Sequence, residues 1–296
     1  MSGTSLLIDY HNMSFRCFFT KEIGITTPAP DFQLWKYMMI NSIYGALYKI
    51  DNVREVILAI DDSQPWRKVY FPRYKESRKK RREDTDIDWQ ILYNILEKYA
   101  LEMKEKLPFK VLKVSRAEAD DVIAILSMEV IDRDKVIISN DEDFQQLCSG
   151  KTKLYNPSKK EYIECEDTEG FIVKKSLLGQ PKDDIFNIKT PSDWGLTPDT
   201  EGKRKPGYGV AALEKTMKFG WQEWLKENKL EENFKRNRIL IDFRMIPKPI
   251  RGNIAKAYKD YNLASPENIY KFFKENGFRS FLEDFTKVEN KLMELY

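Results

Sequence analysis

The sequence predicts an α/β protein in which helices flank a central, mostly parallel sheet and a smaller helical part follows. Short apolar runs of strand length lie at 5–8, 56–60, 109–114 and 135–138. Helical spacing of apolar residues covers 32–50 and 84–106 between these runs, which is typical of strand–helix–strand units with parallel strands. From about Lys189 the sequence changes to scattered charge, several prolines and helical patterns without a strong strand.

The composition fits a globular protein and argues against several kinds of site. The 296 residues are 42% hydrophobic and 33% charged, and the formal net charge is only +3. A role in nucleic-acid binding must therefore come from local clustering of charge. Cys17, Cys148 and Cys165 lack the spacing of a metal site and suit a reducing compartment. His11 is the single histidine, which argues against a zinc or Ser-His-Asp site, and we expect it in a partly exposed loop.

The sequence gives no sign of a membrane association. No apolar run is long enough to span a bilayer, and no signal peptide opens the chain. We therefore expect a cytoplasmic monomer without a membrane partner.

Carboxylates follow the predicted strands at their C-terminal ends. Asp9 ends the first strand, Asp61 follows the second, and Asp141 and Asp143 follow the strand at 135–138. The C-terminal ends of parallel strands share one edge of a sheet, so we expect these side chains to converge. Crowded carboxylates repel one another unless a cation lies between them, and their hard oxygen ligands suit Mg²⁺ or Mn²⁺.

A second acidic group precedes the same strand. Glu118, Asp120 and Asp121 stand at one end of a helical pattern that continues to Val130. A simpler interpretation is that Asp120 and Asp121 cap this helix while the acids after 138 occupy a turn, because Asp is favoured in both places. The recurrence of acids at three strand ends favours the cation site.

Residues 66–82, which we call the basic segment, are dense in positive charge. They include nine basic residues, one acid and four aromatics. Basic side chains bind phosphates and release counterions, and aromatic rings stack on unpaired bases. A solvated basic loop is the alternative, but the position directly after acidic residues favours nucleic acid. The helix expected next carries Ile87, Ile91, Ile95 and Tyr99 at fourfold spacing, which predicts that these residues pack on the sheet.

A basic, glycine-containing turn at 203–209 opens a predicted helix. Backbone N–H groups at such a helix start can bind a phosphate. A lone Gly-x-Gly is weak evidence, and a plain helix start explains the same residues.

Taken in order, several of these blocks resemble the structure-specific 5′ nucleases, which are the flap endonucleases and the 5′-nuclease domains of bacterial DNA polymerases. The blocks are Leu7-Ile8-Asp9, Ala59-Ile60-Asp61, residues 73–78, residues 118–121, residues 139–144 and Lys182-Asp183-Asp184. The nearest branch is that of the ribonuclease H enzymes of T-even-like bacteriophages, since the likeness extends to residues 87–89 and 240–247. It covers nearly the whole chain.

The resemblance implies a domain organisation and an activity. It implies a PIN-like catalytic domain at 1–188, in which the basic segment forms an arch, and a helical DNA-binding domain at 189–296 with a helix–turn–helix variant around 207–215. The implied activity is Mg²⁺-dependent 5′ to 3′ exonuclease and flap endonuclease action on DNA and RNA–DNA duplex 5′ ends, which removes primers in DNA replication. Two Mg²⁺ ions are implied, with Mn²⁺ as a substitute and room for a monovalent cation at the helix–turn–helix. Forked or flapped DNA and RNA–DNA hybrids would be substrates, a single-strand DNA-binding protein and a sliding clamp are candidate partners, and an infected bacterium would be the setting of a phage-encoded enzyme.

The resemblance also assigns roles to single residues. The first metal ion is assigned to Asp9, Asp61, Glu118, Asp120 and Asp141. The second is assigned to Asp143 and Asp183, with Asp121 through water. Lys75 and Arg78 are assigned to the scissile phosphate or the threaded 5′ strand. Further nucleic-acid contacts are assigned to Arg67, Lys68, Arg73, Tyr74, Lys79, Lys80, Arg81, Arg82, Lys203, Arg204, Lys205, Gly207 and Gly209.

Three departures from the family pattern bear on the second ion. Gln180 stands where the family has an aspartate, Glu142 stands where a glycine is common, and the turn at 206–209 is less regular. Two other functions stay open. Gln180 leaves room for a catalytically weak or inactive protein that binds branched nucleic acid, and Ile60-Asp61-Asp62-Ser63 suggests a phosphatase with an Asp nucleophile. The basic segment has no role in a phosphatase.

Overall fold

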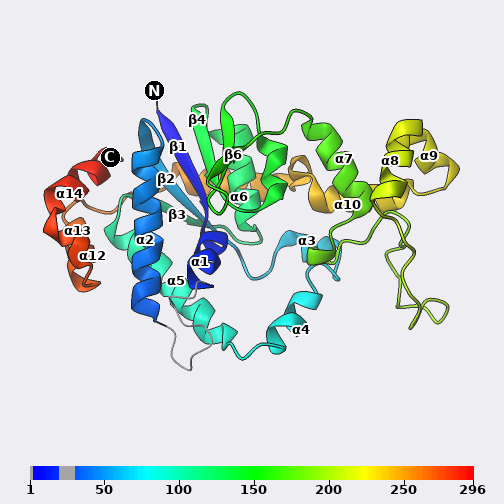
Figure 1. The fold of residues 1–296 in the computed structure, drawn as a ribbon, viewed down its shortest axis with the longest axis horizontal. Coiled ribbons are helices and arrows are strands. Elements are labelled where there is room, and N and C mark those ends of the chain that lie inside the picture. Colours follow the sequence, from blue (N-terminus) through cyan, green and yellow to red (C-terminus); the bar gives the residue numbers. More distant parts are fainter. Residues whose placement is uncertain (1–2, 20–30) are drawn as a thin grey trace. The chain divides into compact units, whose positions relative to one another are not determined.

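The computed structural model describes residues 3–19 and 31–296, which form two compact units (Figure 1). The first unit contains the described residues of Met1–Pro65, Asp86–Glu164 and Lys248–Tyr296. The second contains Trp66–Thr85 and Cys165–Pro247. These units are groups of residues in mutual contact, so the domain boundary that we expect at residue 188 stays a prediction.

A six-stranded sheet in the order β3–β2–β1–β4–β5–β6 forms the centre of the first unit. Its strands are β1 (Thr4–Asp9), β2 (Val53–Ile60), β3 (Phe109–Lys113), β4 (Asp134–Ile138), β5 (Thr152–Asn156) and β6 (Glu161–Ile163). All neighbouring strands are parallel except β5 and β6, which are antiparallel. The four predicted strands are confirmed as β1 to β4, and so is the mostly parallel sheet flanked by helices.

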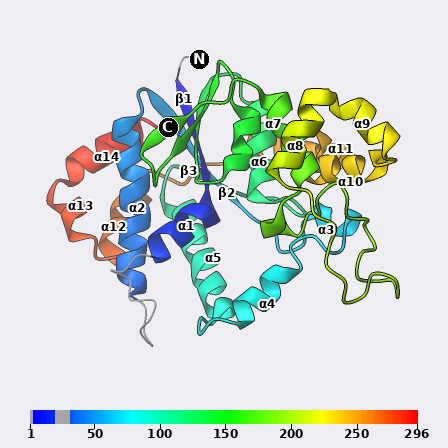
Figure 2. The ribbon, with the colours of Figure 1, turned by 45° about the vertical axis from the view of Figure 1, so that its right-hand side comes forward.

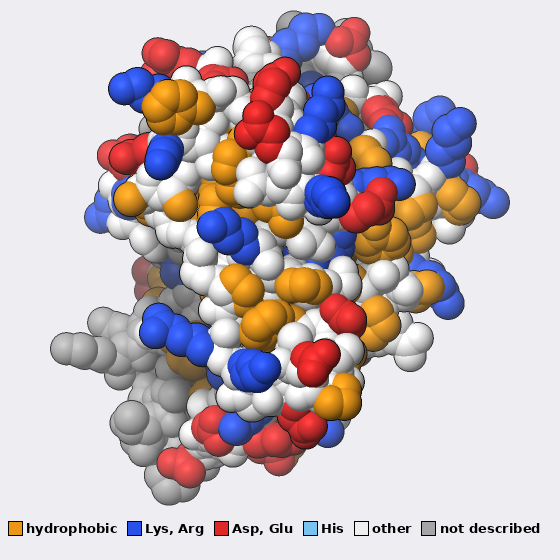
Figure 3. Space-filling view, turned by 90° about the vertical axis from the view of Figure 1, so that its right-hand side faces the viewer, with side chains coloured by type: hydrophobic (Ala, Val, Ile, Leu, Met, Phe, Trp, Pro, Cys, Tyr) orange, Lys and Arg blue, Asp and Glu red, His pale blue; other side chains and the backbone are white. Residues whose placement is uncertain are grey.

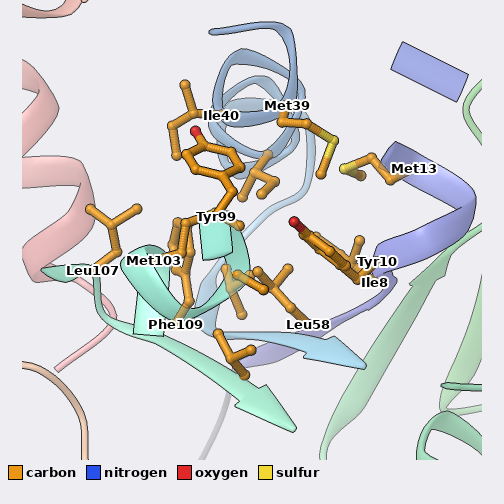
Figure 4. Close-up of a cluster of buried hydrophobic side chains, with 14 of the residues drawn as sticks. Ile8, Tyr10, Met13, Met39, Ile40, Leu58, Tyr99, Met103, Leu107 and Phe109 are labelled. Carbon is orange, nitrogen blue, oxygen red and sulfur yellow. The ribbon is translucent and has the colours of Figure 1, made fainter. Parts of the chain in front are cut away.

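Helices cover both faces of this sheet. They are α1 (Tyr10–Phe18), α2 (Phe32–Lys49), α5 (Trp89–Lys106), α6 (Ala119–Ile125), α11 (Lys248–Lys259), α12 (Asn268–Glu275), α13 (Arg279–Glu283) and α14 (Phe285–Met293), with a π-helical turn η2 (Leu126–Val130) and a 3-10 turn η3 (Glu142–Leu147). On one face Ile8, Leu58 and Phe109 meet Tyr99 and Met103 of α5 (Figure 4). On the other face α6 contacts β1 and β2, and α11 contacts β3. Because β1, β2 and β4 are buried on both faces, they contain continuous apolar runs in the sequence.

The last helices of the chain pack into the core of the sheet unit. Ile269, Phe272 and Phe273 of α12 are fully buried and belong to the same apolar cluster as the strands. The ring of Phe272 lies 6.1 Å from that of Tyr99 on α5. The helices α12 to α14 lie together beside α2 (Figures 1 and 2).

The buried face of α5 differs from the prediction. The helix begins at Trp89, where the Asp88 carboxylate accepts a hydrogen bond from the backbone N–H of Ile91 at 3.0 Å. The side chain of Ile91 is 53% exposed. The buried residues are Leu92, Leu96, Tyr99, Ala100 and Met103. The predicted stripe is therefore confirmed at Tyr99, which is fully buried, and at Ile87 and Ile95, which pack partly buried against the core. It is wrong at Ile91, because each step of four residues turns about 40° too far around a helix of 3.6 residues per turn.

The second unit is helical. Its helices are α3 (Trp66–Tyr70), α4 (Ser77–Glu83), α7 (Thr168–Leu178), α8 (Val210–Phe219), α9 (Trp221–Glu227) and α10 (Glu231–Ile241), with 3-10 turns η4 (Pro181–Asp183) and η5 (Phe243–Met245). The helix predicted after the glycine-containing turn is confirmed as α8, for which Gly209 is the N-cap residue. Gly220 alone separates α8 from α9. The helix–turn–helix variant itself stays a prediction.

Across residues 3–19 and 31–296, no helix combines the length and the apolar composition that crossing a membrane requires.

Candidate metal and nucleic-acid site

Three carboxylates lie at one edge of the sheet, and we call Asp9, Asp61 and Asp141 the acidic edge. Strands β2, β1 and β4 are neighbours and run parallel, so their C-terminal ends lie side by side. Asp9 is the last residue of β1, Asp61 follows β2 directly, and Asp141 follows β4 after two residues. The predicted convergence of strand-end carboxylates is therefore what this strand order produces.

The pKa of Asp9 is raised in part by the negative charges of its neighbours in the acidic edge. Its side chain is buried, and burial raises the pKa of Asp9 to about 7, with further increases from the negative charges of Asp61 and Asp141. The backbone N–H of Asn12 donates to Asp9 Oδ1 at 3.0 Å and lowers the same pKa. Burial and like charge together disfavour the ionised form of Asp9, and a nearby cation would restore it.

The raised pKa of Asp9 predicts a pH-dependent gain in stability for Asp9→Asn. The pKa of an ordinary unfolded Asp is near 4, and that of Asp9 in the folded state is about 7. As the pH rises between these two pKa values, the unfolded state loses its proton more readily than the folded state, and the fold loses stability. In EDTA, the difference in free energy of unfolding should therefore grow in favour of Asp9→Asn between pH 4 and pH 8, to at most about 4 kcal/mol. Urea denaturation across this range measures it, with Asp199→Asn at an exposed site as the control. A difference that does not change with pH would contradict this account of Asp9.

Four further predicted metal ligands of the sheet unit accept hydrogen bonds from backbone N–H groups. Asp61 Oδ1 accepts from Ala119 N–H at 2.7 Å, and Asp141 Oδ1 accepts from Asp143 N–H at 3.0 Å. Glu118 and Asp121 form a capping box at the start of α6, in which Asp121 Oδ2 accepts from Glu118 N–H at 3.0 Å. The simpler interpretation, that these acids cap a helix and a turn, is thus right about the hydrogen bonds of Asp121 and Asp141. The hydrogen bonds of Asp61 and Asp141 involve one oxygen of each carboxylate in the acidic edge.

The donor chemistry of the acidic edge fits a hard divalent cation, although the side chains are not yet gathered around one point. Within the described ranges 3–19 and 31–296, no three Asp, Glu, His or Cys side chains are placed so that they could hold a metal ion together. Ion binding therefore needs side chains to turn inward. Asp61 and Asp141 are only partly buried.

His11 contacts the acidic edge, which the sequence analysis missed. It lies on α1 and not in a loop, and its Nδ1 lies 3.0 Å from Asp61 Oδ2. Its side chain is 13% exposed. The expected partial exposure is confirmed, but the expected loop position is wrong, because Asp9 caps α1 and the helix begins immediately after β1.

A row of aromatic rings begins at His11, and we call it the aromatic row. Phe15 lies 6.0 Å from His11, 6.0 Å from Trp89 and 5.9 Å from Tyr93, measured between ring centroids. Phe19 extends the row, 6.0 Å from Phe15 and 49% exposed. The spacing of four residues from His11 to Phe15 and from Phe15 to Phe19 is the signal in the sequence that would have revealed this row.

Two of the predicted nucleic-acid residues in the basic segment are buried inside the second unit. Arg67 is 2% exposed and its Nε donates to Leu240 O at 2.9 Å. Tyr74 is 3% exposed and belongs to an apolar cluster with Phe186 and Leu240. The assignment of Arg67 and Tyr74 to nucleic-acid contact stays a prediction, and the burial of both side chains argues against it.

The other predicted nucleic-acid residues are accessible. The exposed ones are Lys68, Lys79, Lys80, Arg81, Lys203, Arg204, Lys205, Gly207 and Gly209. The half-buried ones are Arg73, Lys75, Arg78 and Arg82. Figure 3 shows one face of the molecule, where Lys and Arg are interspersed with Asp, Glu and apolar side chains. The face drawn in Figure 3 is therefore not uniformly positive.

One aromatic ring brings the basic segment and the basic turn together. The Arg73 guanidinium lies 4.8 Å and the Lys205 ammonium 4.1 Å from the centroid of Phe186. Burial, and secondly the charge of Arg73, lowers the pKa of Lys205. Residues 66–82 and 203–209 thus contribute to one basic surface of the second unit.

Asp183, which the sequence analysis assigns to the second metal ion, is paired with a basic side chain. It is 5% exposed, and its carboxylate accepts a hydrogen bond from Arg78. A predicted ligand of the second ion is therefore paired with a predicted catalytic residue. Gln180, where the family has an aspartate, is 6% exposed.

Two family models match the chain. The N-terminal resolvase-like domain of 5′-3′ exonucleases matches residues 4–175, and the C-terminal domain of T4 RNase H matches residues 167–288. The ribonuclease H of Enterobacteria phage T4 is 31% identical over 252 residues, which are 82% of this chain and 82% of the relative. The flap endonuclease Xni of Shewanella pealeana is 34% identical over 110 residues, which are 36% of this chain and 40% of the relative.

A solved structure shares the fold. The flap endonuclease of bacteriophage T5, in a pseudo-enzyme-product complex with DNA and metal ions, matches with a TM-score of 0.58 and 17% identity over 86% of this chain and 98% of that one. At this identity the match shows the fold alone. The family models and the phage T4 relative show more: this chain belongs to the 5′-3′ exonuclease family of nucleases.

Proposed function

We propose that this nuclease is Mg²⁺-dependent and cuts at the 5′ ends of flapped DNA and of RNA–DNA hybrids, removing primers during DNA replication. The observation that carries the proposal is the acidic edge, where the buried Asp9 lies in the field of Asp61 and Asp141. The relatives support the substrate class, since they are named ribonuclease H and flap endonuclease. A single-strand DNA-binding protein, a sliding clamp and an infected bacterial cell remain part of the proposal as candidate partners and setting.

The carboxylates divide between two ions in this proposal. Asp9, Asp61, Glu118, Asp120 and Asp141 would hold the first ion, and Asp143, with Asp121 through water, would contribute to the second. The ions would supply an activated water and would stabilise charge on the attacking and leaving oxygens. Asp183 is a weaker candidate than the others, because Arg78 already neutralises its carboxylate.

Basic and aromatic residues would bind the nucleic acid. Lys75 and Arg78 are half-buried and therefore restricted in orientation, which suits contact with the phosphate that is cut. The exposed residues Lys79 and Lys80 suit contacts with the rest of the backbone. His11 would orient Asp61 through the contact of 3.0 Å between them.

Cleavage of a 5′-labelled flap duplex, with and without Mg²⁺, tests the proposed function. We expect products only with the ion, and none from a small phosphate ester that a phosphatase would hydrolyse. Binding of the flap duplex without cleavage at any Mg²⁺ concentration would instead favour the nucleic-acid-binding protein. The pairing of Asp183 with Arg78 is the observation that keeps this second function open.

The aromatic row predicts a stacking contact for unpaired 5′ nucleotides. Phe15→Leu removes the central ring and keeps an apolar side chain of similar size. Loss of one stacked base should weaken binding of a duplex with an unpaired 5′ tail by about tenfold. Binding of a blunt duplex should stay unchanged, and anisotropy titrations of both substrates provide the comparison. Equal losses for both substrates would mean that the row only supports the fold.

A further inference from the structure

The chain after α7 forms a closed loop, residues 179–186, which we call the anchor loop. Gln180 N–H donates to Ile185 O at 2.8 Å, and Ile185 N–H donates to Gln180 O at 3.1 Å. Gly179 has a φ of +71°, and a Cβ there would lie 2.5 Å from the backbone of Ile185 and Phe186. Only glycine fits a backbone approach this close, so the two ends of the loop are held together.

Asn237 of α10 fixes the base of the anchor loop. It is fully buried, and its side-chain amide donates to Ser176 O at 2.7 Å and to Phe186 O at 2.8 Å. One acceptor precedes the loop and the other is its last residue. Breaking either hydrogen bond would leave a buried polar group without a partner, which costs free energy. The base of the anchor loop is therefore held in place by Asn237.

The tip of the anchor loop contacts the start of α4. Asp184 Oδ2 accepts from Ser77 N–H at 2.8 Å, and Asp183 O accepts from Lys75 N–H at 2.9 Å. Arg78 donates to the Asp183 carboxylate, and Arg81 donates to Lys182 O at 2.9 Å. Helix α4 and the residues just before it are therefore held by four contacts from a segment about a hundred residues away in the sequence, and two of these contacts reach the first turn, at Ser77 and Arg78.

Helix α4 needs this support. It has seven residues, and its N-cap residue Glu76 makes no side-chain hydrogen bond to the helix. Five of the seven, at 78–82, are Lys or Arg. Short helices are marginal on their own, and like charges three or four residues apart destabilise them further. The Asp184 carboxylate takes the place of the missing cap, because it accepts the first helical N–H and is a negative charge at the helix start.

We propose that Asp184 is a positioning residue for cleavage: it caps α4 from the anchor loop and thereby fixes Lys75 and Arg78 at the start of the helix. The inference rests on the proposed nuclease function for its effect on rate. The effect on α4 itself does not depend on that function.

The sharpest test compares Asp184→Gly with Asp184→Asn. Asp184 has a φ of +57°, which Gly and Asn both accept, so neither substitution adds backbone strain. Asp184→Gly removes the cap, whereas Asp184→Asn keeps an oxygen that accepts the Ser77 N–H. Lys229→Gly is the matched control, because Lys229 is an exposed residue of the same unit with a φ of +56°.

Trypsin cleavage within 78–82 and steady-state kinetics on a flap duplex provide the two readouts. We expect Asp184→Gly to raise the rate of tryptic cleavage and to lower kcat by about tenfold each, with KM unchanged. Asp184→Asn should restore both values to near those of the wild type, and Lys229→Gly should leave both unchanged. Wild-type values in Asp184→Gly, or equal defects in Asp184→Asn, would overturn the proposal. If the wild type cuts no flap, the proposed function fails while the trypsin comparison still decides whether Asp184 supports α4.

Discussion

Replacement of Asp141 by Asn is expected to abolish cleavage while leaving DNA binding largely intact. The substitution removes one negative charge from the acidic edge and keeps the size of the side chain. The amide oxygen can still accept the Asp143 N–H, so the cap of η3 should survive. Loss of an ion ligand should reduce turnover in saturating Mg²⁺ by at least about 100-fold.

Two measurements on Asp141→Asn separate loss of the ion from loss of the fold. Anisotropy on a flap duplex gives the affinity, which should not fall, because Asp141 is not a phosphate contact. A Mn²⁺ titration of the free protein should show weaker ion binding. Asp132→Asn, at a side chain that is 96% exposed in the same unit, serves as the control and should leave turnover unchanged. Near-normal turnover in Asp141→Asn would remove this residue from the site.

The position of the acidic edge could be predicted from the sequence because it depends on local rules. Apolar runs followed by acids mark strand ends, and parallel strands bring such ends to one edge. The sequence did not reveal that β1 lies between β2 and β4, which makes Asp9 the acid closest to both charged neighbours. Strand order depends on packing between distant segments and leaves no local pattern.

The basic segment shows where composition is a poor guide. Its nine basic residues look alike in the sequence, yet Arg67 is buried against Leu240 while Lys80 is exposed. Leu240 lies 173 residues further along the chain, and no property of the segment itself predicts this contact. The same holds for Asp184, whose partner Ser77 is 107 residues away. Only the three-dimensional structure shows which basic residues are buried and anchor the segment and which are exposed and can bind a ligand.

Lys75→Ala and Lys80→Ala should affect different steps, and this pair is the strongest test of the basic segment. Lys75 has a φ of +55°, its N–H is bonded to Asp183 O at 2.9 Å, and its ammonium lies 4.9 Å from the centroid of Tyr74. Its backbone is thus fixed, and Ala tolerates this backbone no worse than Lys does. A fixed cation stabilises charge that develops during the reaction, so Lys75→Ala should lower the single-turnover rate by about 100-fold with little loss of affinity.

Lys80 lies on the exposed side of α4, where a flexible ammonium acts on phosphates mainly through its charge. Lys80→Ala should therefore weaken binding, reduce the slope of log affinity against log salt by about 1, and leave the single-turnover rate at saturation unchanged. Salt titrations of binding and single-turnover cleavage of one flap duplex measure both quantities for both variants. If the two substitutions changed the same quantity by the same factor, the segment would act only as a uniform positive charge. The fixed backbone of Lys75 would then have no separate role in cleavage, because its ammonium would contribute no more to the reaction than the flexible ammonium of Lys80.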